Sequence, residues 1–422
     1  MALIKKPVTG MKDILPAEMQ IRDYVISLAK ETYGGFGFHS IETPCVEHID
    51  NLCSKQGGDN EKLIFKIMKR GEKLNVAEAQ NEDELTDSGL RYDLTLPLSR
   101  YYANHANELP SPFKALQIGN VFRADRPQKG RFRQFVQCDI DILGDPSFLA
   151  EIELILATTT LLGKLDFKGF TVRINDRKIL KAMAAYAGFE EKDLEGVFIT
   201  LDKMDKIGTD GVKAELTEAG FPVENVDKYL ELFENIEGNI DGLKKLKDVL
   251  KDHLPDETAQ SLETIISSVE ETKNADFTIV FDPTLVRGMS YYTGTIFEIG
   301  MDEFGSSVAG GGRYDDMIGK FTGQKTCACG FSIGFERIIT ILMDRNFKIP
   351  VKGDRKVFLI EKGASGERIC EIMKEASELR KQGVSVLVSQ MNKNKKFQKE
   401  QLIKEGYAPG DIRDFYNEEL KR

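Results

Sequence analysis

Charged and aromatic residues between positions 117 and 144 have a spacing that could form a ligand site on a sheet. The segment reads as two strands joined by a basic loop. In the second strand Gln137, Asp139 and Asp141 alternate with apolar residues, so the three share one face. The same alternation in the first strand directs Arg123 to a matching face. These cations and carboxylates predict the floor of a site for a charged ligand, and a solvated charged hairpin is the alternative.

The loop between these strands is basic. Arg126, Lys129 and Arg131 flank Pro127 and Gly130. A flexible positive loop is suited to contact phosphate groups.

A second polar set lies upstream, in the segment 90–97. Asp93 and Thr95 alternate with apolar residues, which predicts a strand with both on one face, followed by a helix over 98–105. A carboxylate with a hydroxyl two residues later can accept hydrogen bonds from an ammonium group. A half-exposed edge strand is the alternative.

Further candidates lie after residue 284. Arg287 stands beside Gly288, where a guanidinium can meet an anion with little steric hindrance, and the pair 291–292 offers two tyrosine rings with polar tips. The glycine cluster 309–315 does not match a phosphate-binding loop, so we expect either close approach of backbone to a ligand or a tight turn. Arg337 falls early in a predicted helix, where it would complement an anion.

Composition places the chain among globular proteins of two to three domains. It has 422 residues, of which 41% are hydrophobic and 30% charged, with a net charge of −10. No apolar run is long enough for a membrane span, and residues 1–13 lack the apolar core of a secretory signal, so we expect a cytoplasmic protein. The six cysteines have no paired CxxC spacing, which argues against a zinc site and a disulfide framework.

The remaining patterns predict the elements that must position these residues. We expect helices over 16–33, 151–165 and 395–405, strands over 38–43, 61–68, 170–174, 277–282, 357–360 and 384–388, a loop over 78–88, an acidic helical insertion over 175–273, a strand leading into a helix over 329–342, and a helix over 366–382. The last segment alternates strand and helix, as in a small α/β domain. Its basic helix is either a binding stripe or a solvated face.

Taken together, the motifs are far more specific than any one of them. The chain resembles histidyl-tRNA synthetases, members of the class II aminoacyl-tRNA synthetases, over residues 1 to 390. The resemblance rests on FHSIETP (38–44) as motif 1, RYDLTLPLSRYYA (91–103), FRADRPQKGRFRQFVQCDIDILG (122–144) as motif 2, LVRGMSYYTGTIFE (285–298), AGGGRYD (309–315), and GFSIGFER (330–337) as motif 3.

The resemblance implies an α+β fold, with an antiparallel sheet flanked by helices, a helical insertion and a C-terminal α/β domain that binds the anticodon. It implies a first part of the catalytic core over 1–174, the insertion over 175–273, a second part of the core over 274–345, and a shortened anticodon-binding-like domain over 354–422. It also implies a homodimer assembled through motif 1.

The implied reaction joins histidine to tRNA(His) through histidyl-adenylate, with ATP and Mg²⁺ as cofactors. Histidine's carboxylate is already ionised near neutral pH, so the first step needs charge neutralisation rather than a general base. By resemblance Arg123 and Arg287 stabilise the α-phosphate and are the catalytic residues. Arg131 and Arg337 resemble ligands of the outer phosphates, and Phe135 resembles the ring on which adenine stacks. Mg²⁺ would bridge the phosphates, and no metal-ligating side chain is expected.

The resemblance also implies an amino acid site and contacts to tRNA. Residues that match histidine-binding positions are Asp93, Thr95 and Gln137 for the ammonium group, Asp141 and Tyr292 for the imidazole, and Tyr291 and Tyr314 beside them. A pocket that hydrogen-bonds both ring nitrogens can reject analogues that lack them, because its own buried groups would be left unpaired. Arg126 and Gln128 resemble residues that meet the tRNA acceptor end.

Three features depart from the family pattern. Asp93, Asp125 and Asp141 stand where many bacterial members carry the longer Glu, and Ser290 replaces an acid that commonly precedes the tyrosine pair. After the strand over 384–388 the chain continues into a Lys-rich helix and a tail that lacks the later strands expected of a full anticodon domain.

Two other functions compete with the synthetase hypothesis. A catalytically silent paralogue, such as the histidine-sensing regulatory subunit of ATP phosphoribosyltransferase, would lose the phosphate-binding arginines and the LVRGxxYY signature, which this chain keeps. A nucleotide-binding module without tRNA chemistry would lack the basic loop.

Overall fold

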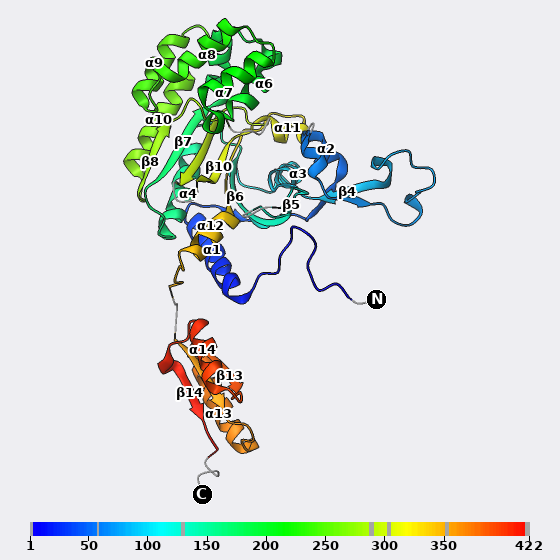
Figure 1. Ribbon diagram of the computed structural model, residues 1–422, viewed down its shortest axis with the longest axis vertical. Helices are drawn as coiled ribbons and strands as arrows, with labels where there is room; N and C mark the ends of the chain where they lie inside the picture. Colours follow the sequence, from blue (N-terminus) through cyan, green and yellow to red (C-terminus); the bar gives the residue numbers. More distant parts are fainter. Residues whose placement is uncertain are drawn as a thin grey trace. The chain divides into compact units, whose positions relative to one another are not determined.

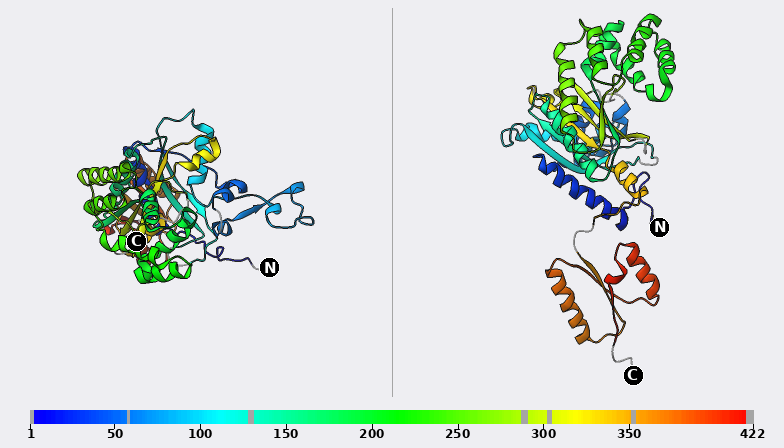
Figure 2. Two further views of the ribbon diagram at one scale, coloured as in Figure 1. Left: turned by 90° about the horizontal axis from the view of Figure 1, so that it is seen from above. Right: turned by 90° about the vertical axis from the view of Figure 1, so that its left-hand side faces the viewer.

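The computed structural model describes residues 3–56, 59–127, 131–286, 291–301, 305–350 and 354–417. The chain divides into two compact units, one formed by Met1–Ile14 with Ile21–Arg345 and the other by Asn346–Arg422 with the short segment Leu15–Gln20. Figure 1 labels their elements and Figure 2 shows them from two further sides.

The first unit is built on an eight-stranded, mostly antiparallel sheet. Its strand order is β1-β5-β6-β11-β10-β9-β7-β8, and only the outer pairs β1–β5 and β7–β8 are parallel. The strands span His39–Ser40 (β1), Phe113–Phe122 (β5), Gln134–Leu143 (β6), Phe170–Asp176 (β7), Phe277–Phe281 (β8), Thr295–Met301 (β9), Ser306–Arg313 (β10) and Ala328–Ile333 (β11). This sheet and its flanking helices confirm the predicted fold class.

Several helices of the first unit pack against the faces of this sheet or lie at its ends. They are α1 (Pro16–Gly35), α3 (Thr95–His105), α4 (Leu149–Lys164), α11 (Asp316–Thr322) and α12 (Phe335–Asp344). In α1 the buried residues Ile21, Val25 and Ala29 follow each other at four-residue intervals, so one stripe of the helix faces the core. Figure 1 shows α1 and α12 side by side, and an ion pair described below joins them.

A small antiparallel sheet adjoins the large one and differs from the prediction. Its order is β2-β4-β3, with strands Val46–His48 (β2), Lys66–Met68 (β3) and Thr86–Leu90 (β4), and α2 covers Ile49–Gln56. The strand predicted over 61–68 is confined to β3, after a 3-10 turn at Asp59–Leu63. The loop predicted over 78–88 contains most of β4. The other described 3-10 turns are Gly71–Lys73, Asp83–Leu85, Glu191–Asp193 and Pro409–Asp411.

The strand predicted over 90–97 is wrong, because the chain turns into α3 at Thr95. The Oδ1 atom of Asp93 accepts a hydrogen bond from the backbone N–H of Leu96 at 3.0 Å, so the aspartate caps the first turn. Pro97 fits there because first-turn N–H groups have no helical partner.

Between β7 and β8 the chain forms the predicted helical region. Its helices are α5 (Arg177–Ala187), α6 (Leu194–Leu201), α7 (Met204–Glu218), α8 (Val223–Asn235), α9 (Ile240–Leu250) and α10 (Asp256–Thr272). They gather at the β7–β8 side of the sheet, as Figure 1 shows in green. His253 is exposed there.

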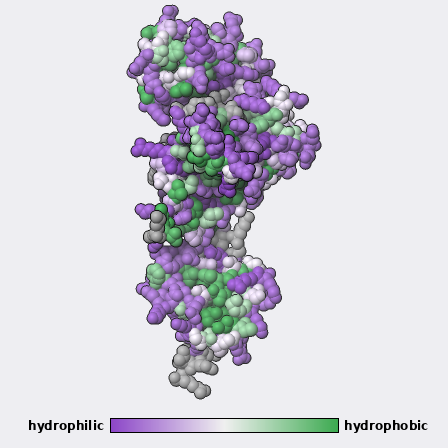
Figure 3. Space-filling view, turned by 90° about the vertical axis from the view of Figure 1, so that its right-hand side faces the viewer, coloured by the Kyte–Doolittle hydropathy of each residue, from purple (hydrophilic) through white to green (hydrophobic). Residues whose placement is uncertain are grey.

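The second unit is a parallel three-stranded sheet with a helix on each face. The order is β13-β12-β14, and the elements are β12 (Arg355–Ile360), α13 (Gly366–Lys381), β13 (Ser385–Gln390), α14 (Lys395–Lys404) and β14 (Ile412–Phe415). Strand β14 lies in the tail that was expected to lack strands, so that expectation is wrong. A space-filling view shows apolar residues gathered on one face of this unit (Figure 3).

Candidate active site

One cavity of about 650 Å³ collects most of the residues predicted for the site. Its lining includes Asp93, Thr95, Arg123, Arg131, Phe135, Gln137, Asp141, Tyr291, Tyr292, Tyr314 and Arg337. Arg126 is exposed and is not among the lining residues. Gln128, Arg287 and Ser290 lie outside the described residues.

The strand register explains why these side chains meet. Gln117 of β5, Asp139 of β6, Ser332 of β11 and Gly310 of β10 form one row across the sheet. Side chains in such a row point to the same face. Asp141 lies two residues after Asp139 in β6, so its side chain points to the same face and lines the same cavity.

Glycines opposite Asp141 provide the space for its carboxylate. Asp141 pairs in register with Gly330, which pairs with Gly312. A Cβ atom on Gly330 would lie 2.0 Å from Asp141 Oδ1, and one on Gly312 would lie 3.0 Å from the ring of Tyr292. The glycine cluster thus lies within strand β10, so the tight-turn interpretation is wrong. Close approach of this backbone to a ligand stays a prediction.

Two buried carboxylates lie at one end of the cavity. Asp141 is 3% exposed and accepts a hydrogen bond from the hydroxyl of Tyr314 at 2.6 Å. Burial, and then the nearby Asp139, raise the pKa of Asp141 to about 8. Asp139 is 4% exposed, and burial raises its pKa to about 7 despite hydrogen bonds from Ser332 and Gln137. Both groups favour a cationic ligand, because a positive charge would compensate their loss of hydration.

Aromatic rings and Asp93 complete this end. The rings of Tyr291 and Tyr292 lie 4.6 Å apart, and Tyr291 meets Tyr314 edge-on at 6.0 Å. Asp93 is 5% exposed, and its Oδ2 atom is buried without a hydrogen-bond partner. Thr95 begins α3 and lines the same cavity. The end is therefore aromatic-walled and rich in hydrogen-bond acceptors.

The other end of the cavity carries positive charge, from three guanidinium groups that are partly or well exposed. Arg123 lies over the rings of Tyr92 at 4.2 Å and Phe135 at 5.1 Å, and its Nε donates to the Tyr92 carbonyl at 3.2 Å. Arg131 is exposed and pairs with Asp125 at 3.1 Å. Arg337, in the first turn of α12, donates to the carbonyl of Ser307. This end suits a polyanion.

A buried ion pair fixes the helix that carries Arg337. Glu336 accepts two hydrogen bonds from Arg22 of α1, at 2.6 and 2.8 Å, and one from the backbone N–H of Val136 at 3.1 Å. Bidentate geometry of this kind sets orientation as well as energy. The start of α12 is therefore held against α1 and β6.

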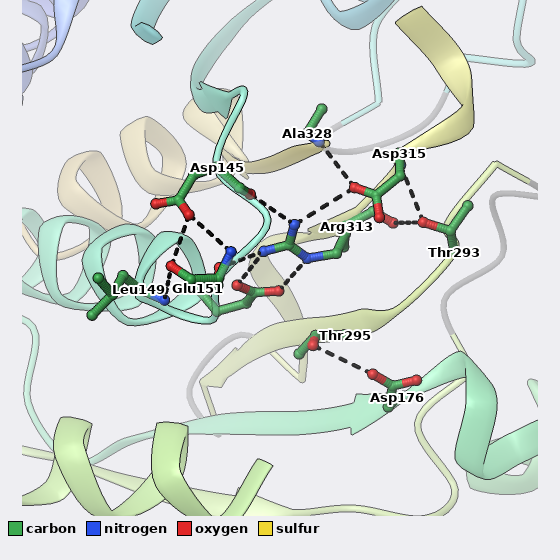
Figure 4. Close-up of polar contacts among 10 residues, drawn as sticks. Asp145, Leu149, Glu151, Asp176, Thr293, Thr295, Arg313, Asp315 and Ala328 are labelled. Atoms are coloured by element: carbon green, nitrogen blue, oxygen red, sulfur yellow. Dashed lines mark hydrogen bonds and ion pairs between the residues drawn. The ribbon is translucent and has the colours of Figure 1, made fainter. Parts of the chain in front are cut away.

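Arg313 holds the other face of the sheet. Its guanidinium forms a bidentate pair with Glu151 of α4 at 2.6 and 2.7 Å, and it donates to the Asp145 carbonyl at 3.0 Å (Figure 4). Asp315 lies 3.5 Å from the same guanidinium. Because Tyr314 follows Arg313 directly, this anchor also places the hydroxyl that contacts Asp141.

A second cavity of about 770 Å³ lies between the sheet and the helical region. It is lined partly by Arg173, which forms ion pairs with Asp282, with Asp205 at 3.3 Å and with Glu298 at 4.0 Å. Its guanidinium is thus matched by the protein's own carboxylates. The three carboxylates outnumber the single guanidinium, but each of them pairs with it, so the described lining of this cavity offers no unmatched cation for a polyanion.

Sequence reasoning placed Asp139 on the correct face but gave it no role, and it missed Ser332 and Glu336. The signal for Asp139 was its position between Gln137 and Asp141 in one alternating strand. Glu336 had no such signal, because its partner Arg22 is 314 residues away.

Other classes of site leave no trace in the described part of the chain. No group of three or more His, Cys, Asp or Glu residues there could hold a metal ion, and the cysteines are free. Among those residues, no helix has the length and apolar character needed to traverse a bilayer.

Comparison with known proteins decides the family. The sequence model described as Histidyl-tRNA synthetase matches residues 10–338. The chain belongs to the histidyl-tRNA synthetase family. A protein of Leifsonia xyli named histidine–tRNA ligase is 44% identical over 353 residues, which cover 80% of each chain.

Solved structures share the fold. The histidyl-tRNA synthetase of Nostoc sp. PCC 7120 superposes with a TM-score of 0.79 at 28% identity, covering 96% of this chain and 90% of that one. A Bacillus halodurans protein described as an ATP phosphoribosyltransferase regulatory subunit/histidyl-tRNA synthetase gives a TM-score of 0.78 at 19% identity, covering 99% and 100%. At that identity the second likeness concerns the fold alone.

Proposed function

We propose that this chain is a histidine–tRNA ligase that uses ATP to activate histidine and then transfers it to tRNA(His). The observation that carries the proposal is a single cavity with carboxylates and tyrosines at one end and guanidiniums at the other, in a chain matched to the family over residues 10–338. The two ends fit an amino acid and a triphosphate.

At the amino acid end, Asp93, Thr95 and Gln137 would hold the ammonium group of histidine. Asp141 and Tyr292 would contact the imidazole, with Tyr291 and Tyr314 forming the walls. The bond from the Tyr314 hydroxyl supports this assignment, because it fixes one oxygen of Asp141 and leaves the other for the ligand. An Asp141→Ala variant should require more histidine for half-maximal exchange, by about tenfold or more, with little change in the ATP requirement. An equal effect on ATP would count against an imidazole contact.

At the phosphate end, Arg123 would neutralise the charge that develops when histidine's carboxylate attacks the α-phosphate. Arg131 and Arg337 would bind the outer phosphates, and Phe135 would stack on adenine. The partial exposure of all four side chains supports this, since they remain accessible to a ligand. Arg287 is proposed as a second catalytic cation on the strength of the LVRGMSYY motif alone.

We propose that Mg²⁺ enters with ATP. The buried carboxylates Asp93, Asp139 and Asp141 lie at the amino acid end, and Glu336 at the other end already accepts from Arg22 and Val136, so the oxygens of the triphosphate are the fitting ligands for the ion. When bound, Mg²⁺ would stabilise charge on the phosphates and help pyrophosphate leave.

The remaining partners are proposals from the family resemblance. We propose a homodimer through motif 1 (38–44), tRNA acceptor contacts by Arg126 and Gln128, anticodon contacts by the second unit, and a cytoplasmic location. The exposure of Arg126 supports a contact with a polyanion. Sedimentation at several concentrations tests the dimer.

The competing function is a histidine-sensing regulatory subunit. Such a protein has no need of phosphate-binding arginines, yet Arg123, Arg131 and Arg337 line the cavity. The deciding experiment is ATP–pyrophosphate exchange by the unmodified chain, tested with each of the twenty amino acids, followed by charging of tRNA(His). We expect exchange with histidine only, and then histidyl-tRNA. Histidine binding without exchange would overturn the ligase proposal in favour of the sensor.

A further inference from the structure

Asp139 is a buried carboxylate that none of the roles above uses. It lies in β6 between Gln137 and Asp141, on the face that lines the cavity. A buried carboxylate is costly unless its oxygens are satisfied. The contacts that satisfy Asp139 therefore indicate what it does.

Both oxygens of Asp139 accept hydrogen bonds from neighbouring side chains. The hydroxyl of Ser332, directly across from it in β11, donates to Oδ1. The amide Nε2 of Gln137 donates to Oδ2 at 3.1 Å. A bound cation favours the ionised form of Asp139. In that form the carboxylate can only accept hydrogen bonds, so it selects the nitrogen end of the Gln137 amide. The oxygen end of that amide must then point away from Asp139.

That oxygen has no hydrogen-bond partner. Gln137 Oε1 is buried and unpaired, as is Asp93 Oδ2 in the same cavity, whereas the other oxygen of Asp93 is occupied by the N–H of Leu96. Two buried acceptors without donors indicate a missing donor-rich group. A primary ammonium group has three N–H donors and a positive charge, so it fits both.

The opposite orientation of Gln137 would not serve this ligand. If the amide were turned, Nε2 would face the ammonium group, and two sets of donors would oppose each other. Among the described hydrogen bonds of the Gln137 side chain, those to Asp139 select between the two orientations. Asp139 thus decides whether Gln137 offers an acceptor or a donor.

We propose that Asp139 is a positioning residue, which orients the amide of Gln137 so that its oxygen receives the α-ammonium group of histidine. The proposal rests on the proposed histidine site. Asp139 acts through Gln137, while Ser332 holds Asp139 in place. The carboxylate of Asp139 interacts electrostatically with three charged groups, those of Arg123, Asp93 and Asp141.

Two substitutions test the orientation. Asp139→Leu has a similar size and no acceptor, so Gln137 loses its defined orientation. Asp139→Asn offers both an acceptor and a donor, so it can bond either end of the Gln137 amide and selects its orientation only in part. We expect Asp139→Leu to raise the KM for histidine about tenfold or more, and Asp139→Asn to raise it by less. The KM for ATP should change less than twofold in both.

The analogue 3-(imidazol-4-yl)propanoate, which lacks the amino group, tests which part of the ligand is affected. As a competitive inhibitor it should bind the wild type and Asp139→Leu equally well. In a Gln137→Leu background, adding Asp139→Leu should cause little further loss, because the two residues act as one unit. Ser332→Ala, which removes the other hydrogen bond to Asp139, should have a smaller effect on the KM for histidine than Asp139→Leu.

Several outcomes would overturn the proposal. An unchanged KM for histidine in Asp139→Leu would mean that Asp139 does not orient Gln137. If Asp139→Leu weakened the binding of histidine and of the analogue equally, the amino group would not be the part of the ligand that is affected. If the effects of Gln137→Leu and Asp139→Leu were fully additive, Asp139 would not act through Gln137. Thermal melting identifies any variant that fails to fold, and Asp139→Asn then carries the test with the analogue. If the wild type shows no histidine-dependent exchange, the proposed function fails, which is distinct from failure of the role of Asp139.

Discussion

The two ends of the cavity differ in the sign and in the solvent exposure of their charged side chains. At the amino acid end Asp93, Asp139 and Asp141 are each at most 5% exposed, and hydrogen bonds from the protein fix them. At the phosphate end Arg123 and Arg131 are partly or well exposed. Buried charge is selective but costs stability, whereas exposed charge attracts a polyanion at little cost. Under the proposed function, selectivity and charge stabilisation are therefore separated along one cavity.

The largest expected effect tests the phosphate end. Arg123→Ala should lower histidine-dependent ATP–pyrophosphate exchange by about 100-fold or more, because a preorganised charge opposite the reacting phosphate is lost. Saturating histidine should not restore the rate. Arg368→Ala, which removes an exposed arginine of the second unit paired with Glu371, is the matched control and should be near normal. Rescue by histidine would instead assign Arg123 to the amino acid end.

A steric change tests the amino acid end. Gly330→Ala places a methyl group 2.0 Å from the present position of Asp141 Oδ1, so the carboxylate must move, and the KM for histidine should rise about tenfold or more. Gly300→Ala in β9 is the control, since no atom lies within 4 Å of its new Cβ. Steady-state exchange kinetics measure both. Normal histidine kinetics in Gly330→Ala would show that the position of Asp141 does not matter.

A milder change examines the outer part of the phosphate end. Arg131→Ala should raise the KM for ATP about threefold to tenfold and leave the KM for histidine unchanged, because an exposed cation contributes modestly in water. Raising the ionic strength should reduce the difference between the wild type and the variant. A salt-independent difference would contradict a screened, solvent-exposed contact.

The smallest effect concerns stability and pH. Asp141 has a pKa of about 8 in the folded chain against 3.8 as its ordinary value, so the folded state binds more protons between those values. Stability should therefore fall as pH rises from about 4 to 8. Asp141→Asn lacks this penalty, and its Tm without histidine should exceed that of the wild type at pH 8.5 by about 2 °C or more, but not at pH 5.

The exposed Asp227→Asn, whose aspartate pairs with Lys213 on the surface, serves as the control and should show no such pH dependence. Calorimetry at both pH values provides the comparison. A Tm advantage of Asp141→Asn that is equal at pH 5 and pH 8.5 would argue against a buried ionised carboxylate.

Strand patterning allowed the floor of the cavity to be predicted. In β6 each polar residue on the cavity face follows an apolar one, so the period of two specifies the face directly. The same pattern misled at Asp93 and Thr95, because alternation over three residues also occurs before a helix, and the Asp cap and the proline at position 97 were the better signal. The glycines of β10 have no side chains, so they carried no periodicity to reveal a strand.

Contacts between distant segments could not be predicted at all. The role proposed for Asp139 depends on Ser332, which reaches it through the pairing of β6 with β11. Strand β14 was missed because its four residues pair with β12 across more than fifty residues of chain. Neither pairing has a local signature, so tertiary structure was needed to find it.

The pair formed by Arg22 and Glu336 has a consequence for synthesis on the ribosome. Its arginine emerges early, and the carboxylate follows 314 residues later. The helix bearing Arg337 can be locked in place only when nearly the whole first unit has been translated. A nascent chain that ends before Glu336 would therefore lack this anchor for the start of α12.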